Sequence, residues 1–299
     1  MPAAPCRPGG RLAHDPTDRT GETMFDQPAR FTDSIPDHYD RGLGPYLFVD
    51  YAADLARRVA TCKPERVLET AAGTGIVTRL LRDALPPSAR FVASDLNLPM
   101  LEIARHKFVD TEQVEFQQAD AAALPFADAT FDALVCQFGL MFFPDKAKAY
   151  SEAFRVLAPN GHYHFNVWDS FEFNPFARIA HEAVGRFFEN DAPAFFTIPF
   201  GSHRIDAIKT ALIDVGFADI SMEVVRIDKR IEDVRRLAEG LIFGSPIVGE
   251  IDARGTADPA AIAGAVTAAL QVEFGENARR MTLQAIVFDA HKPFDRSSG

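Results

Sequence analysis

Between residues 65 and 169 the sequence alternates short apolar segments with segments of helical periodicity, and this alternation is the strongest constraint on the fold. The apolar segments have the length and composition of buried strands, and the connections between them are short. Strands that alternate with helices in this way build a parallel sheet with helices on both faces. The sequence therefore predicts an α/β fold with a doubly wound, mostly parallel sheet. The expected strands are 65–70, 89–95, 114–120, 131–139 and 162–169.

Two further strands are expected in the C-terminal part of the chain. Residues 219–231 and 281–290 have strand-like composition, which brings the sheet to seven strands. The excursion between them, 231–280, reads as mainly helical, with Asp258-Pro259 as a helix start. The Phe-rich segment 170–202 lacks strand alternation. Together with that excursion it predicts a helical lid above the sheet.

The N-terminal residues have the composition of a tail. Residues 1–30 are rich in Pro, Gly, Arg and Thr and poor in large apolar residues, so they are predicted to be disordered. They lack the apolar core of a signal peptide, and Met24 is a second possible start. Residues 36–60 are expected to be helical and to cover one edge of the sheet. The remainder, 31–299, predicts a single domain.

The bulk composition limits the kind of partner. The chain has 31 Lys and Arg against 42 Asp and Glu, and its net charge of −11 disfavours non-specific binding to nucleic acid. Cys6, Cys62 and Cys136 form no CxxC motif and indicate free thiols in a reducing compartment. No apolar run reaches the roughly 18 residues of a membrane-spanning helix. These features predict a cytoplasmic protein that acts on a small molecule, without predicting its oligomeric state.

The turn after the first predicted strand carries the first chemical signal. In "VLETAAGTG", residues 67–75, a carboxylate at Glu69 stands at the mouth of a glycine-rich turn. A pyrophosphate at a helix N-terminus is held by bare amides and positive potential, so Glu69 would repel it. The G-x-G-x-x-G pattern of dinucleotide sites is also broken, because Thr78 follows Gly73 and Gly75. The turn therefore predicts a ligand that carries positive charge in place of phosphates.

Acidic residues also end the next two predicted strands. Asp95 lies 20 residues after Gly75, where a carboxylate can accept both ribose hydroxyls. Asp120 ends the third strand, where it can accept a hydrogen bond from an exocyclic amine. Parallel strands bring their carboxyl ends to one edge of a sheet, where such sheets bind ligands. The expected ligand offers hydroxyls, an amine and a cationic centre but no pyrophosphate, and S-adenosylmethionine fits this description.

These segments together resemble class I S-adenosylmethionine-dependent methyltransferases. The residues that carry the resemblance are "VLETAAGTG", "ASDLNLPML", "FQQADAAALPFADATFDALVCQFGLMFFPD" and "AYSEAFRVLAPNGHYHFNVW". They are similar to the subgroup typified by ubiquinone and menaquinone C-methyltransferases, over roughly residues 36–170. The first turn of that family usually reads E/D-x-G-x-G-x-G, and here Ala71 replaces its first glycine. The resemblance implies a Rossmann-like methyltransferase fold. Its parts would be an N-terminal helical cover at 36–64, a cofactor-binding half at 65–170, and a lid and C-terminal half at 171–299.

The resemblance also implies a set of cofactor contacts at the ends of the first four strands. Glu69 would reach the amino group of the methionine moiety directly or through a water, Asp95 would hold the ribose, and Asp120 would read the adenine amine. Glycines of the first turn would let the backbone approach the cofactor. The complete implied set is Tyr39, Glu69, Ala71, Gly73, Thr74, Gly75, Asp95, Leu96, Met100, Asp120, Ala121, Gln137 and Phe138.

No catalytic residue follows from the sequence. Methyl transfer is an in-line displacement from an already activated sulfonium, so alignment and exclusion of water can suffice. Should a base be needed, four residues are possible without a signal that ranks them: His38, Tyr39, Asp169 and His203. His162 and His164 flank Tyr163 in a predicted strand, and no metal site is expected there.

The Phe-rich segment suggests the kind of acceptor. In this fold the end of the fifth strand lies beside the transferable methyl group, and eight Phe residues follow it directly. They predict a small, largely apolar acceptor under a lid from 171–200 and part of 231–280. Whether carbon, oxygen or nitrogen is methylated is not predicted. The eight are Phe171, Phe173, Phe176, Phe187, Phe188, Phe195, Phe196 and Phe200.

Two other functions stay open. A sheet of this type can bind the cofactor and transfer nothing, as a scaffold or regulatory partner. An NAD-dependent oxidoreductase is the other, and Glu69 and Thr78 disfavour it.

Overall fold

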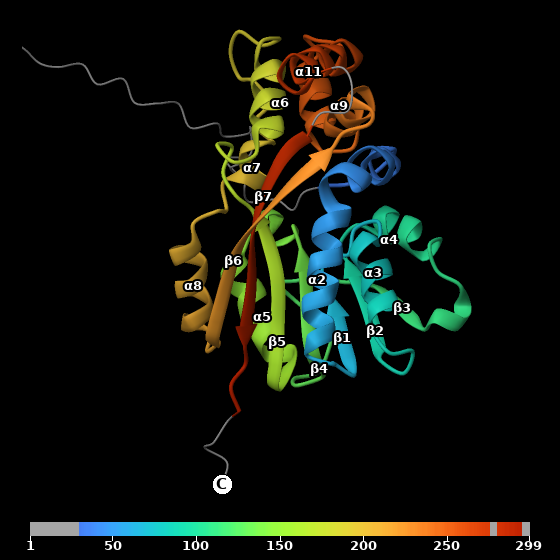
Figure 1. Cartoon of the computed structure of the whole chain (residues 1–299), viewed down its shortest axis with the longest axis vertical. Helices are drawn as coiled ribbons and strands as arrows, with labels where there is room; N and C mark the ends of the chain where they lie inside the picture. Colours follow the sequence, from blue (N-terminus) through green and yellow to red (C-terminus); the bar gives the residue numbers. More distant parts are fainter. Residues whose placement is uncertain (1–29, 276–279, 295–299) are drawn as a thin grey trace, which may run out of the picture.

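A seven-stranded sheet forms the centre of the protein, shown in the computed structural model of residues 30–275 and 280–294 (Figure 1). The strand order is β3-β2-β1-β4-β5-β7-β6, in which β7 runs antiparallel to both of its neighbours. The predicted α/β class with a doubly wound, mostly parallel sheet is therefore confirmed. The strands are β1 Arg66–Glu69, β2 Arg90–Asp95, β3 Val114–Gln118, β4 Phe131–Gln137, β5 Leu157–Trp168, β6 Ala218–Arg230 and β7 Arg280–His291. The tail predicted at 1–30 lies, apart from Arg30, outside the described residues.

The helix α2, Val49–Thr61, covers the middle of one sheet face. Its side chains Leu55 and Val59 are fully buried against Val67 and Val135 of the central strands. The helices expected within 36–60 are present, but the expected position of α2 at an edge is wrong. The reason is that its apolar stripe repeats every three to four residues and needs the apolar centre of the sheet for burial.

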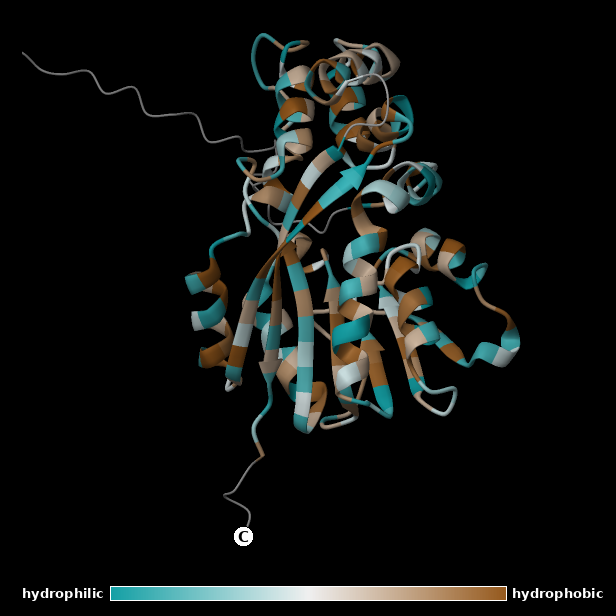
Figure 2. Cartoon of the chain, in the orientation of Figure 1, coloured by the Kyte–Doolittle hydropathy of each residue, from teal (hydrophilic) through white to brown (hydrophobic). Residues whose placement is uncertain are grey.

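The other helices of this half lie either before β1 or between successive strands, and η1 continues directly into α2. They are α1 Ile35–His38, the π-helix η1 Tyr39–Phe48, α3 Ile76–Ala84, α4 Leu98–Arg105, α5 Lys146–Val156, and the short 3-10 helices η2 Asp110–Glu112 and η3 Leu140–Phe142. Figure 2 shows hydrophobic and hydrophilic residues alternating along the edge strand β6, whereas the buried centre of β1, Val67 and Leu68, is hydrophobic.

A group of helices lies beyond the ends of β6 and β7 and forms the lid (Figure 1). Helix α11 packs against both α9 and α6 through buried side chains such as Val266, Leu270 and Leu237. The lid helices are α6 Pro175–Gly185, α7 Thr197–Phe200, α9 Val234–Phe243, α10 Ile247–Arg254 and α11 Pro259–Phe274, whereas α8 Ile205–Asp214 lies beside β6.

The lid docks onto η1 through two glycines. A Cβ atom built on Gly42 would lie 2.7 Å from the Cα atom of Gly240, so the backbones of η1 and α9 touch. Any side chain at either position would separate them.

Among the described residues, no helix is both long enough and apolar enough to cross a membrane.

Candidate functional site

A cavity of about 360 Å³ opens at the carboxyl ends of the central strands, below η1 and α7. Its two sides differ in chemistry. One side, called here the polar wall, consists of the loops after β1, β2 and β3, with Gly73, Asp95, Asn97 and Asp120. The other, the aromatic wall, consists of Phe31, Tyr39, Phe48, Phe138, Phe142, Phe143, Trp168, Phe176, Phe195, Phe196 and Phe200.

Ten of the thirteen cofactor contacts that the resemblance implied line this cavity: Tyr39, Ala71, Gly73, Asp95, Leu96, Met100, Asp120, Ala121, Gln137 and Phe138. The other three, Glu69, Thr74 and Gly75, lie behind its surface, in or beside the first turn. Gly75 packs instead against α4, where a Cβ atom would lie 2.8 Å from the Cβ atom of Ala104. The expected strand-end residues thus meet at one edge of the sheet.

Asp95 is held rigidly at the centre of the polar wall. Its Oδ2 accepts a hydrogen bond from the amide of Gly73 at 2.9 Å, and its Oδ1 accepts from the amide of Asn97 at 2.8 Å. Asn97, which the sequence did not single out as a contact, also accepts from the amide of Phe31 through its Oδ1 at 3.2 Å. Burial raises the pKa of Asp95, and the bonds from Asn97 and Gly73 oppose that rise. This network fixes the direction in which the carboxylate faces the cavity.

Glu69 is buried with an unsatisfied carboxylate oxygen. Only 1% of the residue is exposed, and its Oε2 has no hydrogen-bond partner among the described residues. The hydroxyl oxygens of Thr74 and Thr78 are also buried and make no hydrogen bond of acceptable geometry among the described residues. Burial raises the pKa of Glu69 to about 8, the nearby hydroxyl of Thr78 opposes that rise, and the charge of Asp95 adds to it. A buried polar group without a partner costs about 1–3 kcal/mol, so a donor that reached Oε2 of Glu69 would remove this cost.

The first turn accommodates Ala71 because of a glycine that sequence reasoning missed. Ala71 has a φ of 53°, in the left-handed region that normally favours glycine. A Cβ atom built on Gly139 would lie 2.3 Å from the Cβ atom of Ala71, so the methyl group occupies space that Gly139 leaves free. Gly73 has a φ of 56°, and nothing lies within 4 Å of the position its Cβ atom would take. The turn therefore leaves an open cradle at Gly73.

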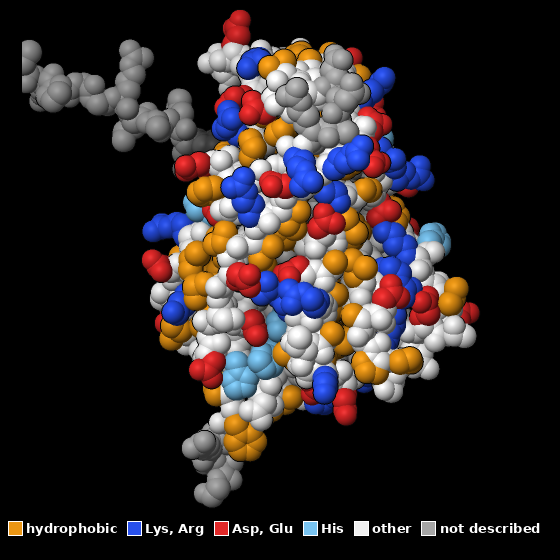
Figure 3. All heavy atoms as spheres, in the orientation of Figure 1, with side chains coloured by type: hydrophobic (Ala, Val, Ile, Leu, Met, Phe, Trp, Pro, Cys, Tyr) orange, Lys and Arg blue, Asp and Glu red, His pale blue; other side chains and the backbone are white. Residues whose placement is uncertain are grey.

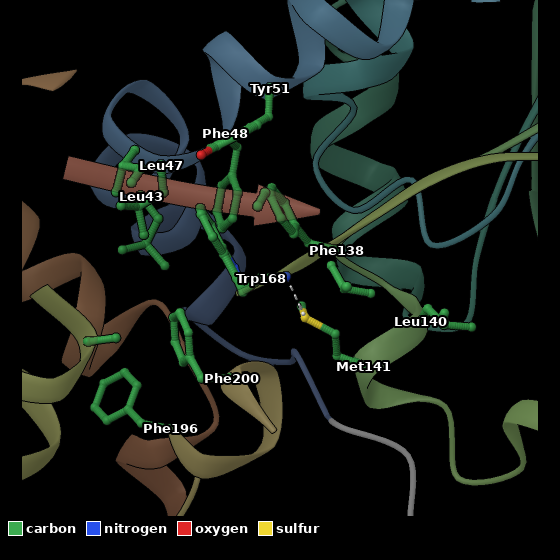
Figure 4. Packing of buried hydrophobic residues seen from close by; sticks show 14 of the residues in the cluster. Leu43, Leu47, Phe48, Tyr51, Phe138, Leu140, Met141, Trp168, Phe196 and Phe200 are labelled. Atoms are coloured by element: carbon green, nitrogen blue, oxygen red, sulfur yellow. Dashed lines mark hydrogen bonds between the residues drawn. The ribbon is translucent and has the colours of Figure 1, made fainter. Parts of the chain in front are cut away.

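The aromatic wall is built around Trp168, which Figure 4 shows between Phe48, Phe138 and Phe200. The rings of Phe138 and Trp168 stack with their centroids 4.0 Å apart and their planes 7° apart. Phe138 has a φ of 51°, an outlier for a bulky residue that costs about 1–3 kcal/mol. Its amide donates to Oδ1 of Asn166 at 3.0 Å, which holds this conformation. This hydrogen bond thus holds the strained backbone conformation that places the ring of Phe138 at the cavity.

Of the four possible bases, Tyr39 alone lines the cavity. Burial raises the pKa of its hydroxyl, so Tyr39 is a poor proton acceptor at neutral pH. Asp169 accepts hydrogen bonds from Ser170 and Gln284, and Nδ1 of His203 contacts the carbonyl oxygen of Phe200 at 2.8 Å. His38 is exposed, with its ring beside Phe243.

The eight Phe residues after β5 do not act as one group. Phe176, Phe195, Phe196 and Phe200 line the cavity, whereas Phe173 and Phe187 are exposed and Phe171 and Phe188 pack elsewhere. The sequence missed much of the rest of the aromatic wall. Phe142 and Phe143 lie within the motif "GLMFFPD", and Phe48 follows the cavity-lining Leu43 and Leu47 at helical spacing, so those signals were readable.

Residues 68–165 match the family model described as "Methyltransferase domain". A demethylmenaquinone methyltransferase of Thermus thermophilus is 45% identical over 111 residues, which cover 37% of this chain and 49% of the relative. A ubiquinone/menaquinone biosynthesis C-methyltransferase of Pasteurella multocida is 31% identical over 175 residues, covering 53% and 64%. The match therefore spans about half to two thirds of the length of these curated relatives.

The fold also has solved counterparts. The structure of an S-adenosylmethionine-dependent methyltransferase from Thermotoga maritima, titled as a possible histamine N-methyltransferase, superposes with a TM-score of 0.51 at 16% identity. The superposition covers 88% of this chain and 98% of that one, and at this identity it shows the fold alone. The resemblance to class I methyltransferases of the ubiquinone/menaquinone C-methyltransferase type is confirmed.

Proposed function

We propose that this chain, which resembles class I methyltransferases, binds S-adenosylmethionine and transfers its methyl group to a small, largely apolar acceptor. One observation carries the proposal: a single cavity joins the strand-end carboxylates of Asp95 and Asp120 to a wall of aromatic side chains. Its volume, about 360 Å³, is within the usual range of small-molecule sites. A polar end and an apolar end in one space suit a polar cofactor beside an apolar acceptor.

The residues of the first turn fit the cofactor. The open cradle at Gly73 allows close approach to the backbone, and Asp95, fixed by two amides, can accept hydrogen bonds from ribose hydroxyls. Asp120 lies at the same edge, and we propose that it accepts from the adenine amine. The unsatisfied Oε2 of Glu69 can accept from a cationic amino group, directly or through a water, and such a group would favour the ionised form of this buried carboxyl.

When bound, S-adenosylmethionine supplies a methyl group on a positively charged sulfur. The aromatic wall would exclude water from that group, and aromatic faces attract cations that approach within about 6 Å. Gln137 donates to the carbonyl oxygen of Phe48 at 3.3 Å, so it ties the end of β4 to η1 of the aromatic wall. The main contribution of the protein is then alignment of the two reactants.

The proton of the acceptor has no dedicated receiver on the aromatic wall, where Tyr39 keeps its own proton. This supports an acceptor that is already nucleophilic when it binds. The curated relatives are named for demethylmenaquinone and for ubiquinone and menaquinone biosynthesis, so reduced quinone-like rings are the first acceptors to test.

Titration calorimetry with S-adenosylmethionine, S-adenosylhomocysteine and NAD tests the binding step. We expect both sulfur ligands to bind and NAD not to bind, and binding of NAD alone would support the oxidoreductase alternative. A screen of quinol-like and other aromatic acceptors, scored by release of S-adenosylhomocysteine, tests transfer. Cofactor binding without turnover on any acceptor would favour the scaffold alternative.

We also propose where in the cell the protein acts and which class of molecule it binds. The acidic composition and the cysteines without a CxxC motif support a cytoplasmic enzyme of small molecules that does not bind nucleic acid. Cell fractionation and a gel-shift assay with mixed DNA and RNA would test these two points.

A further inference from the structure

A second cluster of reactive side chains lies away from the cavity, where α2 ends over the sheet. Cys62 follows directly after α2, His162 and His164 lie on β5, and Asp289 lies on β7. The strand register pairs His164 with Asp289 and His162 with His291, so these side chains share one face of the sheet. Figure 3 shows histidine side chains gathered at the lower end of this face. None of these residues lines the cavity.

One distance in this cluster matches that of two ligands on one metal ion. The Sγ atom of Cys62 lies 3.7 Å from Nε2 of His164. One ligand atom from each of Cys62, His162 and His164 lies within 4.8 Å of the other two. Zinc bonds of about 2.3 Å to sulfur and 2.0–2.1 Å to nitrogen, at tetrahedral angles, put the two donor atoms about 3.6 Å apart. The sulfur and the nitrogen are therefore already separated as two ligands of one ion.

We propose that Cys62, His162 and His164 bind a divalent transition metal ion, with Zn²⁺ as the best match to one thiolate and two imidazoles. Cys62 is exposed, so the fourth coordination position faces solvent and can hold a water molecule. The metal site is separate from the proposed methyl transfer and does not depend on it.

The carboxylate of Asp289 lies beside the Nδ1 atoms of both histidines, on the side away from the proposed metal. Its Oδ1 lies 2.9 Å from Nδ1 of His162 and 3.7 Å from Nδ1 of His164, so the Nε2 atoms of both rings point away from it. A carboxylate on the far nitrogen is the usual second partner of a metal-bound histidine, because it fixes the ring and the tautomer. The Nδ1 atom of His164 is buried and has no hydrogen bond within the described chain.

One nearby cation would oppose a metal, and it is neutralised. Arg58 lies on the last turn of α2, but its guanidinium group donates to Asp54 at 2.6 Å and to Glu223 at 2.8 Å. The two carboxylates compensate its charge. A bound metal would join the end of α2 to β5 and so fasten the N-terminal helices to the C-terminal side of the sheet.

The test uses the full chain without an affinity tag, stripped with a chelator and titrated with Zn²⁺ or Co²⁺. We expect one tightly bound zinc per chain by elemental analysis, and with Co²⁺ a thiolate-to-metal charge-transfer band in the near ultraviolet. Cys62→Ser should abolish that band and weaken zinc binding at least tenfold. The substitution is on the surface, so circular dichroism should show an intact fold.

Two controls keep the result specific. Cys6→Ser and Cys136→Ser remove the other thiols of the chain and should leave the band unchanged.

A further variant tests the supporting carboxylate. Asp289→Asn should keep the stoichiometry but weaken zinc binding by about 10- to 100-fold, as expected for a second partner of a ligand. The proposal fails if wild type binds no stoichiometric metal. It also fails if Cys62→Ser retains the charge-transfer band.

Discussion

The polar wall and the aromatic wall of the cavity are made in different ways. The polar wall comes from a short continuous part of the sequence, from the first turn at Gly73 to the loop at Asp120, through three successive strand ends. The aromatic wall collects side chains from Phe31 to Phe200, which lie on five elements (η1, η3, β5, α6 and α7) and on segments outside them. A parallel sheet brings consecutive strand ends together by its topology alone, whereas the aromatic wall exists only after the lid and η1 have docked.

The two walls are also held by different forces. Hydrogen bonds of 2.8–2.9 Å to backbone amides fix Asp95, while ring stacking and burial fix Trp168. We therefore expect changes in the aromatic wall to affect folding and acceptor use, and changes in the polar wall to affect the cofactor.

The largest effect is expected at the centre of the aromatic wall. Trp168 is 3% exposed and stacks on Phe138, so Trp168→Ala should lower the free energy of unfolding by about 3–5 kcal/mol. Urea denaturation measures this loss. Phe173→Ala is the matched control, because Phe173 is exposed and its removal should change stability by only about 0.5 kcal/mol. Similar losses in both variants would mean that the aromatic wall is not the distinct structural unit described above.

In the polar wall, Asp95→Ala should weaken S-adenosylmethionine binding by about 1–3 kcal/mol, because it removes a fixed charged acceptor from the ribose hydroxyls. Calorimetry measures the change. Asp95→Asn keeps the size and some of the hydrogen bonding, so it should lose less. An unchanged dissociation constant in Asp95→Ala would refute the ribose assignment and, with it, the functional meaning of the polar wall.

The buried carboxyl group of Glu69, beside the first turn, should make the stability of the protein depend on pH. Folding raises its pKa from 4.5 to about 8, so between these values the unfolded chain loses the proton while the folded chain keeps it. The free energy of unfolding of the cofactor-free protein should therefore fall as pH rises through this window, by up to roughly 1.4 kcal/mol per pH unit. Below pH 4.5 this contribution is fully present, and above pH 8 it is lost.

Glu69→Gln cannot ionise, so its stability relative to wild type should improve from pH 5.5 to pH 8. Urea denaturation at three pH values gives the comparison. S-adenosylmethionine should show the complementary trend, binding wild type more tightly as pH approaches 8, because an ammonium group favours the carboxylate. Parallel stability curves for the two proteins would contradict the buried, protonated state of Glu69.

The smallest effect is expected at Phe196, and it tests whether the aromatic wall contacts the acceptor and not the cofactor. Phe196→Leu keeps an apolar side chain at the cavity but removes the ring, so it should raise the acceptor KM by about tenfold at most. Cofactor affinity should stay within about twofold of wild type. An equal loss of cofactor and acceptor binding would mean that the two walls do not divide the ligands between them.

Sequence reasoning found the polar wall because its signals are local. The seven strands follow from alternation and apolar length, and Glu69, Asp95 and Asp120 are at readable strand ends. Once the strands are parallel, the meeting of those ends needs no further information. The sequence did not reveal that Glu69 lies behind the cavity surface with an unsatisfied oxygen, because burial depends on what packs above the turn.

Tertiary structure alone decided the remaining features, and each joins residues far apart in the chain. The methyl group of Ala71 fits because Gly139 has no side chain, α2 lies on the sheet face where an edge was expected, and only half of the Phe-rich segment reaches the cavity. The cluster at Cys62 and His164 spans about 100 residues and depends on the end of α2 and on the register of β5 with β7. Periodicity and composition describe a segment by itself, whereas packing and register depend on which segments become neighbours, and that choice minimises exposed apolar surface over the whole chain.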